Sequence, residues 1–287
     1  MKRIKLLIIP LLLLLTGCTL FKRDDMENIN IITSIYPLEY SIDYLYGESS
    51  VINSIYPDDI NTDEYELTDK QLKDNSTKDL FIYMGLTKDS DIAVELINRN
   101  KNLKLIDATF GMEYKQDVSE LWLNPSNLLM ILQNIKNGLD EYIDNAYLKK
   151  EINTRYKDLK LELSELDASL KTTIENANKK TIYANSKSAM FLEKYGLTVI
   201  VIEEKHELYE KNLALLKEAI ENKKVTYFYR FEDTTLPKGV KELVEGGKIK
   251  ELEFRNLKNI TDEERKNKNT YVDITEKNIE NLKKELY

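Results

Sequence analysis

The feature that most constrains this fold is an alternation of short β-type runs with amphipathic helical patterns, which occurs twice along the chain. Four β-type runs precede the middle of the chain and four follow it. They lie at residues 29–34, 51–55, 79–83, 103–107, 181–184, 198–202, 225–229 and 249–252. Strands that alternate with helices form βαβ units around parallel sheets. The sequence therefore predicts two Rossmann-like α/β lobes.

A long helical pattern separates the two sets of strands. Between Pro125 and Ala177 the chain contains no further proline and only one glycine. Apolar residues recur there at three- and four-residue spacing, at Ile152, Tyr156, Leu159, Leu163, Leu166 and Leu170. This spacing predicts one apolar stripe, for core packing, on a helix of about 30 residues. We expect an N-terminal lobe at 29–125, an interlobe helix region at 126–177 and a C-terminal lobe at 178–287.

Shorter helical patterns fill the intervals between the strands. They lie at residues 38–46, 69–75, 90–98 and 272–286. The second of them is preceded by Thr68, and Gln71 stands three residues later. This is a capping box, in which each side chain accepts a hydrogen bond from the backbone N–H group of the other residue. It predicts that the helix begins directly after Thr68.

The first 18 residues have the pattern of a bacterial export signal. A basic segment precedes an apolar run at residues 6–15, and Thr16 and Gly17 lead to Cys18. Because a membrane span needs about 20 apolar residues, this run is too short to cross a bilayer. The pattern predicts a lipobox, in which Cys18 is diacylated after cleavage, and two acyl chains anchor a protein stably. We expect a lipoprotein on the extracytoplasmic face of the cell membrane, with a polar tether at 19–28.

The composition excludes several classes of function. The formal charge is -8, and removal of the three basic residues of the leader makes it -11. Nucleic acid is therefore not an expected partner, because phosphate binding needs clustered Lys and Arg. The sole histidine, His206, stands among glutamates in a predicted surface loop, and the sequence has no phosphate loop, CxxC pair or HExxH motif. We expect a protein that is not an enzyme, and one without disulfides, because Cys18 is the sole cysteine.

Two acidic loops follow predicted strands. One comprises residues 57–66 and the other residues 120–125. Ligands of open α/β sheets bind at the carboxyl ends of the strands, where both loops are expected. On composition alone, these loops are either solvated surface or part of a binding site.

Several motifs stand in the order that they have in one known family. They are Thr-Ser-Ile-Tyr-Pro-Leu at 33–38, Asp-Glu-Tyr-Glu-Leu-Thr at 63–68, Asp-Leu-Phe-Ile-Tyr-Met-Gly-Leu at 79–86, Val-Ser-Glu-Leu-Trp-Leu-Asn-Pro at 118–125, and the segments 185–198 and 269–278. With these motifs the chain resembles the solute-binding lipoproteins of metal-ion ABC transporters, a family of zinc- and manganese-uptake binding proteins and adhesin lipoproteins. The resemblance covers nearly the whole mature chain.

The resemblance implies a periplasmic-binding-protein-like fold of the metal-binding class, with two lobes bridged by a rigid long helix. It implies a monomeric receptor that captures a divalent metal ion in the interlobe cleft and delivers it to an ABC permease in the membrane. Trp122 matches a family motif, and we expect it to pack at a helix entrance. Two alternatives stay open. One is a degenerate paralogue that binds no metal and serves as a surface adhesin or interaction protein, or binds another small solute. The other is an exported hydrolase that uses Asp63 and Glu120 as acid and base.

The nitrogen ligands of the family are replaced in this sequence. By the matched motifs, Asp63 and Glu120 stand at two histidine positions, and Asn185 stands where relatives have histidine or glutamate. The fourth family ligand is an aspartate near the end of the chain, and it matches Asn256 or, with a different gap, Asn259. The resemblance thus implies a ligand set of Asp63, Glu120, Asn185 and Asn256.

Two interpretations of these replacements compete. In one, the cleft is rebuilt as an oxygen-ligand site, which suits Mn²⁺ or Ca²⁺ better than the Zn²⁺ that imidazole favours. Two facing carboxylates repel each other unless a cation lies between them, so a bound metal ion would relieve this cost. In the other interpretation, the metal site is lost.

Overall fold

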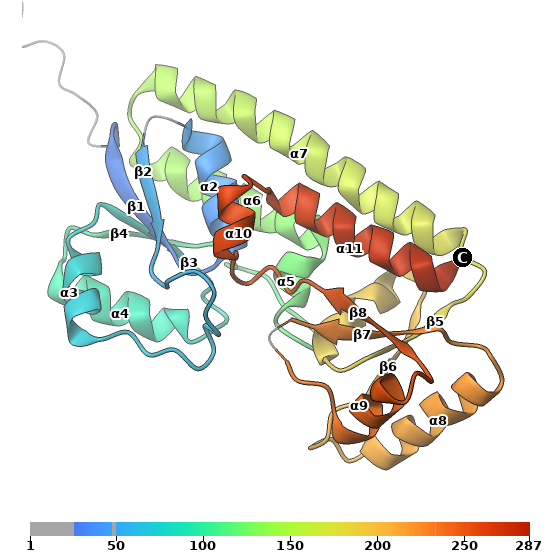
Figure 1. The fold of residues 1–287 in the computed structure, drawn as a ribbon. Helices are drawn as coiled ribbons and strands as arrows, with labels where there is room; N and C mark the ends of the chain where they lie inside the picture. The colour runs from blue at the N-terminus through green and yellow to red at the C-terminus, as the bar shows by residue number, and fades with distance from the viewer. Residues whose placement is uncertain (1–25, 48–49, 233) are drawn as a thin grey trace, which may run out of the picture.

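The structure is a computed structural model that describes residues 26–47, 50–232 and 234–287. The predicted leader, the lipidation site at Cys18 and most of the predicted tether lie outside the described residues. Within the described part of the chain, no helix combines the length and the apolar character that a membrane span requires. Two α/β lobes are joined along one side by long helices (Figure 1).

The N-terminal lobe contains a sheet of four parallel strands in the order β2-β1-β3-β4. The strands are β1 (Ile29–Thr33), β2 (Ser50–Ser54), β3 (Leu80–Tyr83) and β4 (Lys104–Asp107). Successive side chains of a strand point to opposite faces of the sheet. Accordingly, the fully buried Ile31 and Ile32 belong to two different apolar cores. Strand β1 is therefore buried on both faces of the sheet, with only Asn30 exposed.

Helices cover both faces of this sheet. Helix α2 (Tyr36–Tyr46) packs on the face of Ile31, whereas α3 (Asp69–Ser76) and α4 (Asp89–Arg99) pack on the face of Ile32. The capping box is present, because the Thr68 backbone donates to Gln71 at 2.9 Å and the Gln71 backbone donates to the Thr68 hydroxyl at 3.3 Å. The predicted start of α3 is confirmed.

The C-terminal lobe repeats the pattern with the strand order β6-β5-β7-β8, again all parallel. The strands are β5 (Thr181–Ala184), β6 (Thr198–Val201), β7 (Tyr227–Phe231) and β8 (Lys250–Phe254). Strand β7 begins two residues later than the sequence pattern indicates. The reason is a tertiary contact, since the backbone N–H groups of Thr226 and Tyr227 donate to the carboxylate of Glu285 at 2.8 and 2.7 Å. This carboxylate is fully buried and also accepts a hydrogen bond from Lys179.

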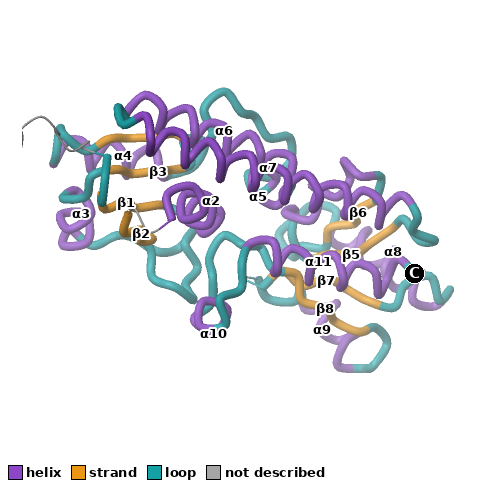
Figure 2. The backbone as a smooth tube through the Cα atoms, turned by 90° about the horizontal axis from the view of Figure 1, so that it is seen from above, coloured by secondary structure: helices purple, strands orange, loops and turns teal. Residues whose placement is uncertain are grey.

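The helices of the C-terminal lobe flank this sheet (Figure 2). They are the 3₁₀ helix η3 (Lys187–Tyr195), α8 (Tyr209–Glu221), α9 (Lys238–Glu245) and α11 (Tyr271–Leu286). Apolar residues of α8 and α9 form one core with the buried Phe228 of β7. Helix α11 lies alongside the long bridging helix α7 (Ala146–Glu175) (Figure 1).

Helix α7 spans both lobes, and α6 (Pro125–Tyr142) packs against it. The predicted helix region is therefore two helices, because the side chain of Asn145 caps a new N-terminus by accepting from the backbone of Tyr147 and Leu148. The predicted stripe is confirmed: its leucines are buried in a core that contains residues of both sheets. A core shared by the two lobes gives the bridge its rigidity.

One segment of the C-terminal lobe crosses to the N-terminal lobe. Residues 257–269, which we call the crossing segment, include α10 (Asp262–Lys266), and α10 lies beside α2 in Figure 1. Arg265 of α10 pairs with Asp58 at 2.5 Å and with Glu39 at 2.6 Å, and both carboxylates belong to the N-terminal lobe. The backbone of Tyr36 donates to the carbonyl of Lys258 at 3.0 Å. These bonds tie the lobes together opposite the helical bridge.

Candidate interlobe binding cleft

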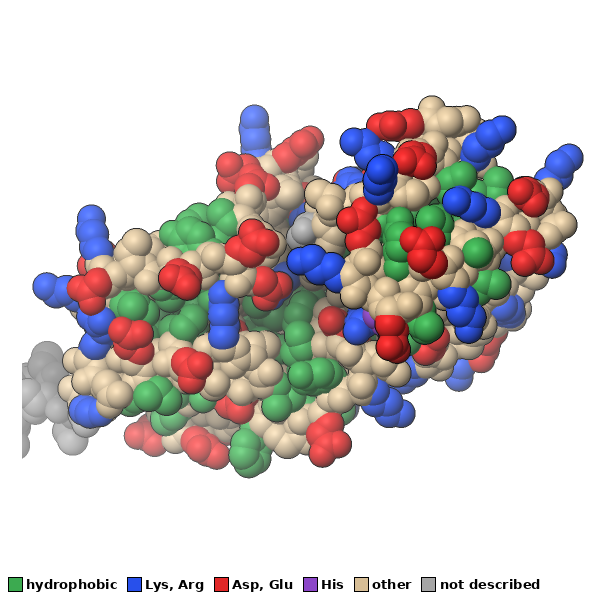
Figure 3. Space-filling view, turned by 90° about the horizontal axis from the view of Figure 1, so that it is seen from below, with side chains coloured by type: hydrophobic (Ala, Val, Ile, Leu, Met, Phe, Trp, Pro, Cys, Tyr) green, Lys and Arg blue, Asp and Glu red, His purple; other side chains and the backbone are tan. Residues whose placement is uncertain are grey.

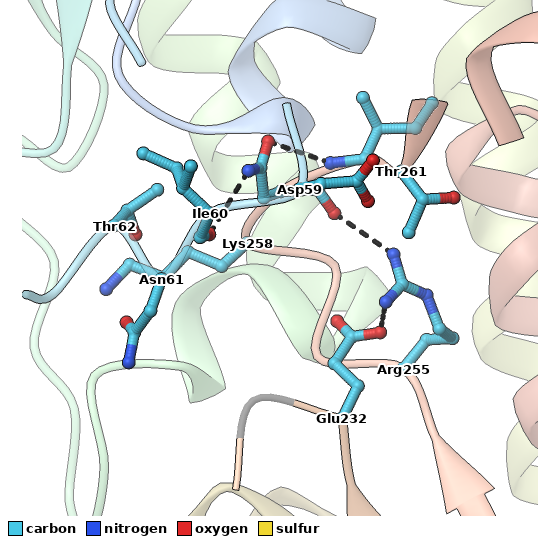
Figure 4. A pocket seen from close by; sticks show the side chains of 10 residues that line it. Asp59, Ile60, Asn61, Thr62, Glu232, Arg255, Lys258 and Thr261 are labelled. Carbon is cyan, nitrogen blue, oxygen red and sulfur yellow. Dashed lines mark hydrogen bonds and ion pairs between the residues drawn. The ribbon is translucent and has the colours of Figure 1, made fainter. Parts of the chain in front are cut away.

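Two adjoining cavities lie between the lobes, and we call them together the interlobe cleft. The first, of about 260 Å³, is lined by residues 59–62 of one lobe and by Glu232, Arg255 and residues 258–261 of the other (Figure 4). The second, of about 200 Å³, is lined by residues of the N-terminal lobe and by Lys258. Thr62 and Lys258 line both cavities. Figure 3 shows the hollow between the lobes, with basic and acidic side chains along its edge.

The cleft is built by loops that leave the carboxyl ends of parallel strands. In the N-terminal lobe these are the loops after β2 and β3, and in the C-terminal lobe they are the loops after β7 and β8. In parallel α/β sheets these ends face the same edge, which is the usual position of a ligand. The acidic loop 57–66 therefore lies at a candidate binding site, which is one of the two alternatives that its composition left open.

Two lysines bring positive charge into the cleft. The ammonium group of Lys258, from the crossing segment, pairs with the Asp63 carboxylate across the lobes. The ammonium group of Lys88 donates to the carbonyl oxygens of Thr62, Asp63 and Tyr65 at 2.7, 3.2 and 3.1 Å. Because three carbonyl groups surround it, Lys88 holds the acidic loop in place.

A buried carboxylate lies in the same cavity. Asp89 is 4% exposed, and burial raises the pKa of its carboxyl group. Hydrogen bonds from the Thr87 hydroxyl and from the backbone, together with the positive charge of Lys258, lower this pKa in part. Burial also raises the pKa of Tyr56, and the negative charges of Asp89 and Asp63 raise it further. Tyr56 is therefore a neutral phenol at physiological pH.

Two hydroxyl groups in this cavity lack a hydrogen-bond partner among the described residues. They belong to Tyr56 and Thr62, each of which is 4% exposed. A buried polar group without a partner costs roughly 1–3 kcal/mol. Such groups at a cavity wall are suited to bind a polar solute.

A charged cluster of one arginine and two glutamates closes the first cavity on the side of the C-terminal lobe. Arg255 follows β8 directly, and its guanidinium group pairs with Glu232 and with Glu264, the latter at 2.7 Å. Figure 4 shows Arg255 and Glu232 directed toward one another below the loop that carries Asp59. This cluster orients the start of the crossing segment.

The two predicted carboxylate ligands have different surroundings. Asp63 lines the second cavity of the cleft, and 66% of its side chain is exposed. Glu120 begins the short helix α5 (Glu120–Leu123), and its carboxylate accepts from the backbone N–H groups of Lys115, Gln116 and Asp117 at 3.2, 2.7 and 3.2 Å. Glu120 lines a separate cavity beside η3. Asp63 and Glu120 therefore do not face each other across one cavity here.

The predicted asparagine ligands are engaged in backbone hydrogen bonds. Asn185 accepts from the Phe231 backbone at 2.9 Å and donates to the Thr234 hydroxyl at 2.6 Å. The backbone carbonyl of Asn256 accepts from the Trp122 indole at 2.8 Å. Asn259, the alternative fourth position, donates to the Pro57 carbonyl at 3.1 Å. The ligand set stays a prediction, and within the described ranges no cluster of three or more His, Cys, Asp and Glu side chains is arranged for a metal ion.

Trp122 and His206 lie where the sequence analysis expected them. Trp122 is 2% exposed in α5, so it packs in the core, and it also forms part of the wall of the second cavity. His206 lies in the turn before α8, where its Nδ1 accepts from the Leu208 backbone at 3.1 Å.

No motif in the sequence singled out Lys88, Asp89, Arg255 or Lys258 as residues of the cleft. Their common signal is position, since each lies within a few residues of a strand end or in the crossing segment. Lys258 stands between Asn256 and Asn259, in the segment where the motif comparison left the gap open. Charged residues were also too frequent in this chain, at 32% of the total, for four of them to be singled out.

Two lobes, a helical bridge and a polar cleft at the carboxyl ends of both sheets define a two-lobed solute-binding protein. Over residues 31–285 the chain matches the family described as zinc-uptake complex component A, periplasmic. The chain belongs to this family. The resemblance inferred from the motifs is confirmed.

Known relatives agree with this assignment. The zinc-binding lipoproteins AdcA of Streptococcus pneumoniae strains R6 and TIGR4 are each 25% identical over 310 residues, and the match covers 99% of this chain. The chain spans 61% of the length of these curated relatives.

Solved structures share the fold. The Zn(II)-bound ZnuA-like domain of Streptococcus pneumoniae AdcA has a TM-score of 0.75 at 22% identity. The metal-dependent lipoprotein YcdH of Bacillus subtilis has a TM-score of 0.77 at 20% identity. Each comparison covers 90% of this chain and 99% of the other chain. The predicted architecture of two parallel-sheet lobes is confirmed.

Proposed function

We propose that this chain is the extracytoplasmic receptor of an ABC importer, which captures a divalent metal ion in the interlobe cleft and delivers it to a membrane permease. The observation that carries the proposal is the cleft itself, where loops of both lobes meet at the carboxyl ends of the strands in a chain of the zinc-uptake family. The relatives that share this fold are described as zinc-binding, so Zn²⁺ is the first cargo to test.

The proposal includes anchoring through Cys18. A receptor that is tethered by two acyl chains stays at the membrane surface, where it meets its permease repeatedly. The mature receptor acts as a monomer in this proposal, because one chain supplies both lobes of the cleft.

Asp63 is the proposed ligand that the cleft favours most, because its carboxylate lies at the boundary of the two lobes. Glu120, Asn185 and Asn256 complete the proposed set. The Glu120 carboxylate can bind the same ion as Asp63 only if it gives up its hydrogen bonds with three backbone N–H groups.

The test uses protein from residue 19 onward, measured by thermal unfolding and by calorimetry with Zn²⁺, Mn²⁺ and Ca²⁺. We expect a cargo ion at 100 times its dissociation constant to add about 2.7 kcal/mol of stability by mass action. We expect Asp63→Ala with Glu120→Ala to abolish this gain, and the single variants show which carboxylate matters. If no divalent ion binds the unmodified protein, the metal proposal is wrong.

The structure also favours a second candidate, a paralogue that binds no metal and serves as an interaction protein. The observation in its favour is that the cleft already contains the chain's own cations, with Lys258 paired to Asp63. The same titration separates the two candidates, because a metal-free paralogue shows neither binding nor stabilisation with any of the three ions.

A further inference from the structure

Lys258 lies at the point of the cleft where a cation would bind. Its ammonium group pairs with Asp63, the proposed ligand at the lobe boundary. The Lys258 side chain is 16% exposed and lines both cavities. The Lys258 ammonium group thus already pairs with the carboxylate that a metal ion would need.

The charges of the second cavity balance without a metal ion. Asp63 and Asp89 supply two negative charges, while Lys88 and Lys258 supply two positive ones. A divalent ion added to this set would meet a neutral site and two nearby ammonium groups. Like charges that lie close together near a protein surface repel each other, so this repulsion weakens metal binding unless one ammonium group leaves.

Only one of the two lysines in this cavity is placed to leave easily. Lys88 is held by three carbonyl groups, so its departure would release the acidic loop. Lys258 meets a carboxylate that is 66% exposed, and ion pairs that are open to solvent contribute little stability. Its ammonium group is strongly hydrated and sits on a flexible stem, so it can turn toward solvent.

The groups left behind suit a hard cation. Without Lys258, the cavity retains the two aspartates and the hydroxyl oxygens of Tyr56 and Thr62, which have no hydrogen-bond partner in the described part of the chain. Carboxylate and neutral oxygen donors of this kind are ligands of divalent ions.

We propose that Lys258 competes with the cargo ion for the Asp63 carboxylate, and that its displacement sets the affinity of the cleft for divalent metal. This inference rests on the proposed function. Metal binds only to the form in which the ammonium group has left Asp63, so the ion pair reduces the apparent affinity in proportion to its population.

The experiment measures Zn²⁺ affinity by competition with a chromophoric chelator, using protein from residue 19 onward. We expect Lys258→Met to bind Zn²⁺ at least about tenfold more tightly, because both the competition and the repulsion are removed. Lys258→Arg retains the positive charge and should not reproduce this gain in affinity. Lys266→Met, a change at an exposed lysine of α10, is the matched control and should leave the affinity unchanged.

A variant of the partner residue excludes a merely structural role. Asp63→Asn breaks the same ion pair as Lys258→Met, so a loss of packing would change Zn²⁺ affinity in the same direction in both. Competition for the carboxylate predicts opposite directions, with tighter binding in Lys258→Met and weaker binding in Asp63→Asn. Metal-free unfolding curves of all variants verify that each is folded.

Two outcomes overturn the inference, and they differ in what they say about the receptor. If unmodified protein binds Zn²⁺ and Lys258→Met binds it within twofold of the same affinity, the competition is disproved while the proposed function stands. If neither protein binds Zn²⁺, Mn²⁺ or Ca²⁺, the competition and the metal-receptor function are both disproved.

Discussion

Single residues of the cleft show how burial and hydrogen bonding oppose each other. Asp89 begins α4 and is almost fully buried, so desolvation disfavours its charged form. Hydroxyl and backbone groups that point at the carboxylate stabilise that same form, and Lys258 adds a positive charge. Burial is the largest of these effects, and the pKa of Asp89 is raised from its ordinary value of 3.8.

The raised pKa of Asp89 predicts a pH-dependent effect on stability. Above pH 3.8 the folded protein holds this proton more strongly than the unfolded chain does, so the contribution of Asp89 to stability falls as the pH rises through the folded pKa. We expect the free energy of unfolding, relative to that of Asp89→Asn, to decrease from pH 4 upward. Urea denaturation of both proteins across pH 4 to 7 measures this. A constant or growing difference would contradict the assignment.

At the scale of elements, the apolar stripe of helix α7 connects the two lobes. Its leucines recur at helical spacing, and the stripe lies in a core that includes residues of both sheets. The helix is long enough to reach both lobes because nothing in its sequence interrupts it. A bridge that packs on both lobes resists bending between them.

The two faces of α7 provide a matched pair of substitutions. Leu163 is fully buried, whereas Leu161, two residues earlier, is 61% exposed. We expect Leu163→Ala to lower the free energy of unfolding by about 2–5 kcal/mol, because it leaves a cavity in the shared core. Leu161→Ala should stay within about 0.5 kcal/mol of the unmodified protein. Chemical denaturation measures the free energy of unfolding of both variants. Equal losses in the two would refute this packing of α7.

At the scale of the whole molecule, the lobes are joined on two sides. The bridge of α6 and α7 forms one connection, and the crossing segment forms the other through Arg265 and the backbone around Lys258. The second connection combines ion pairs and hydrogen bonds with apolar packing, since Leu257 and Ile260 of the crossing segment are buried in the core. Lys258 of the same segment lines the cleft, so a solute in the cleft lies next to this connection.

Arg265 tests the second connection. Its guanidinium group is 43% exposed, but it pairs with two carboxylates that are only 13% and 18% exposed. We expect Arg265→Met to lower the free energy of unfolding by about 1–2 kcal/mol, with Lys266→Met as the neutral control. A double-mutant cycle with Asp58→Asn measures the coupling between the lobes, and a coupling of zero would exclude the pair as an interlobe tie.

The sequence by itself determined the local elements and their order. The patterns that predict these elements involve residues close together in the sequence. They are the periodicity of two or 3.6 residues, the capping box at Thr68 and the apolar stripe on α7. Tertiary structure alone decided the start of β7, where Glu285 accepts hydrogen bonds from two backbone N–H groups, and the chemistry of the cleft. Lys258 lies 195 positions from Asp63, and no local pattern encodes a pair at that separation. The physical reason is that elements form from contacts along the chain, whereas the charge balance of a cleft arises only when distant loops meet.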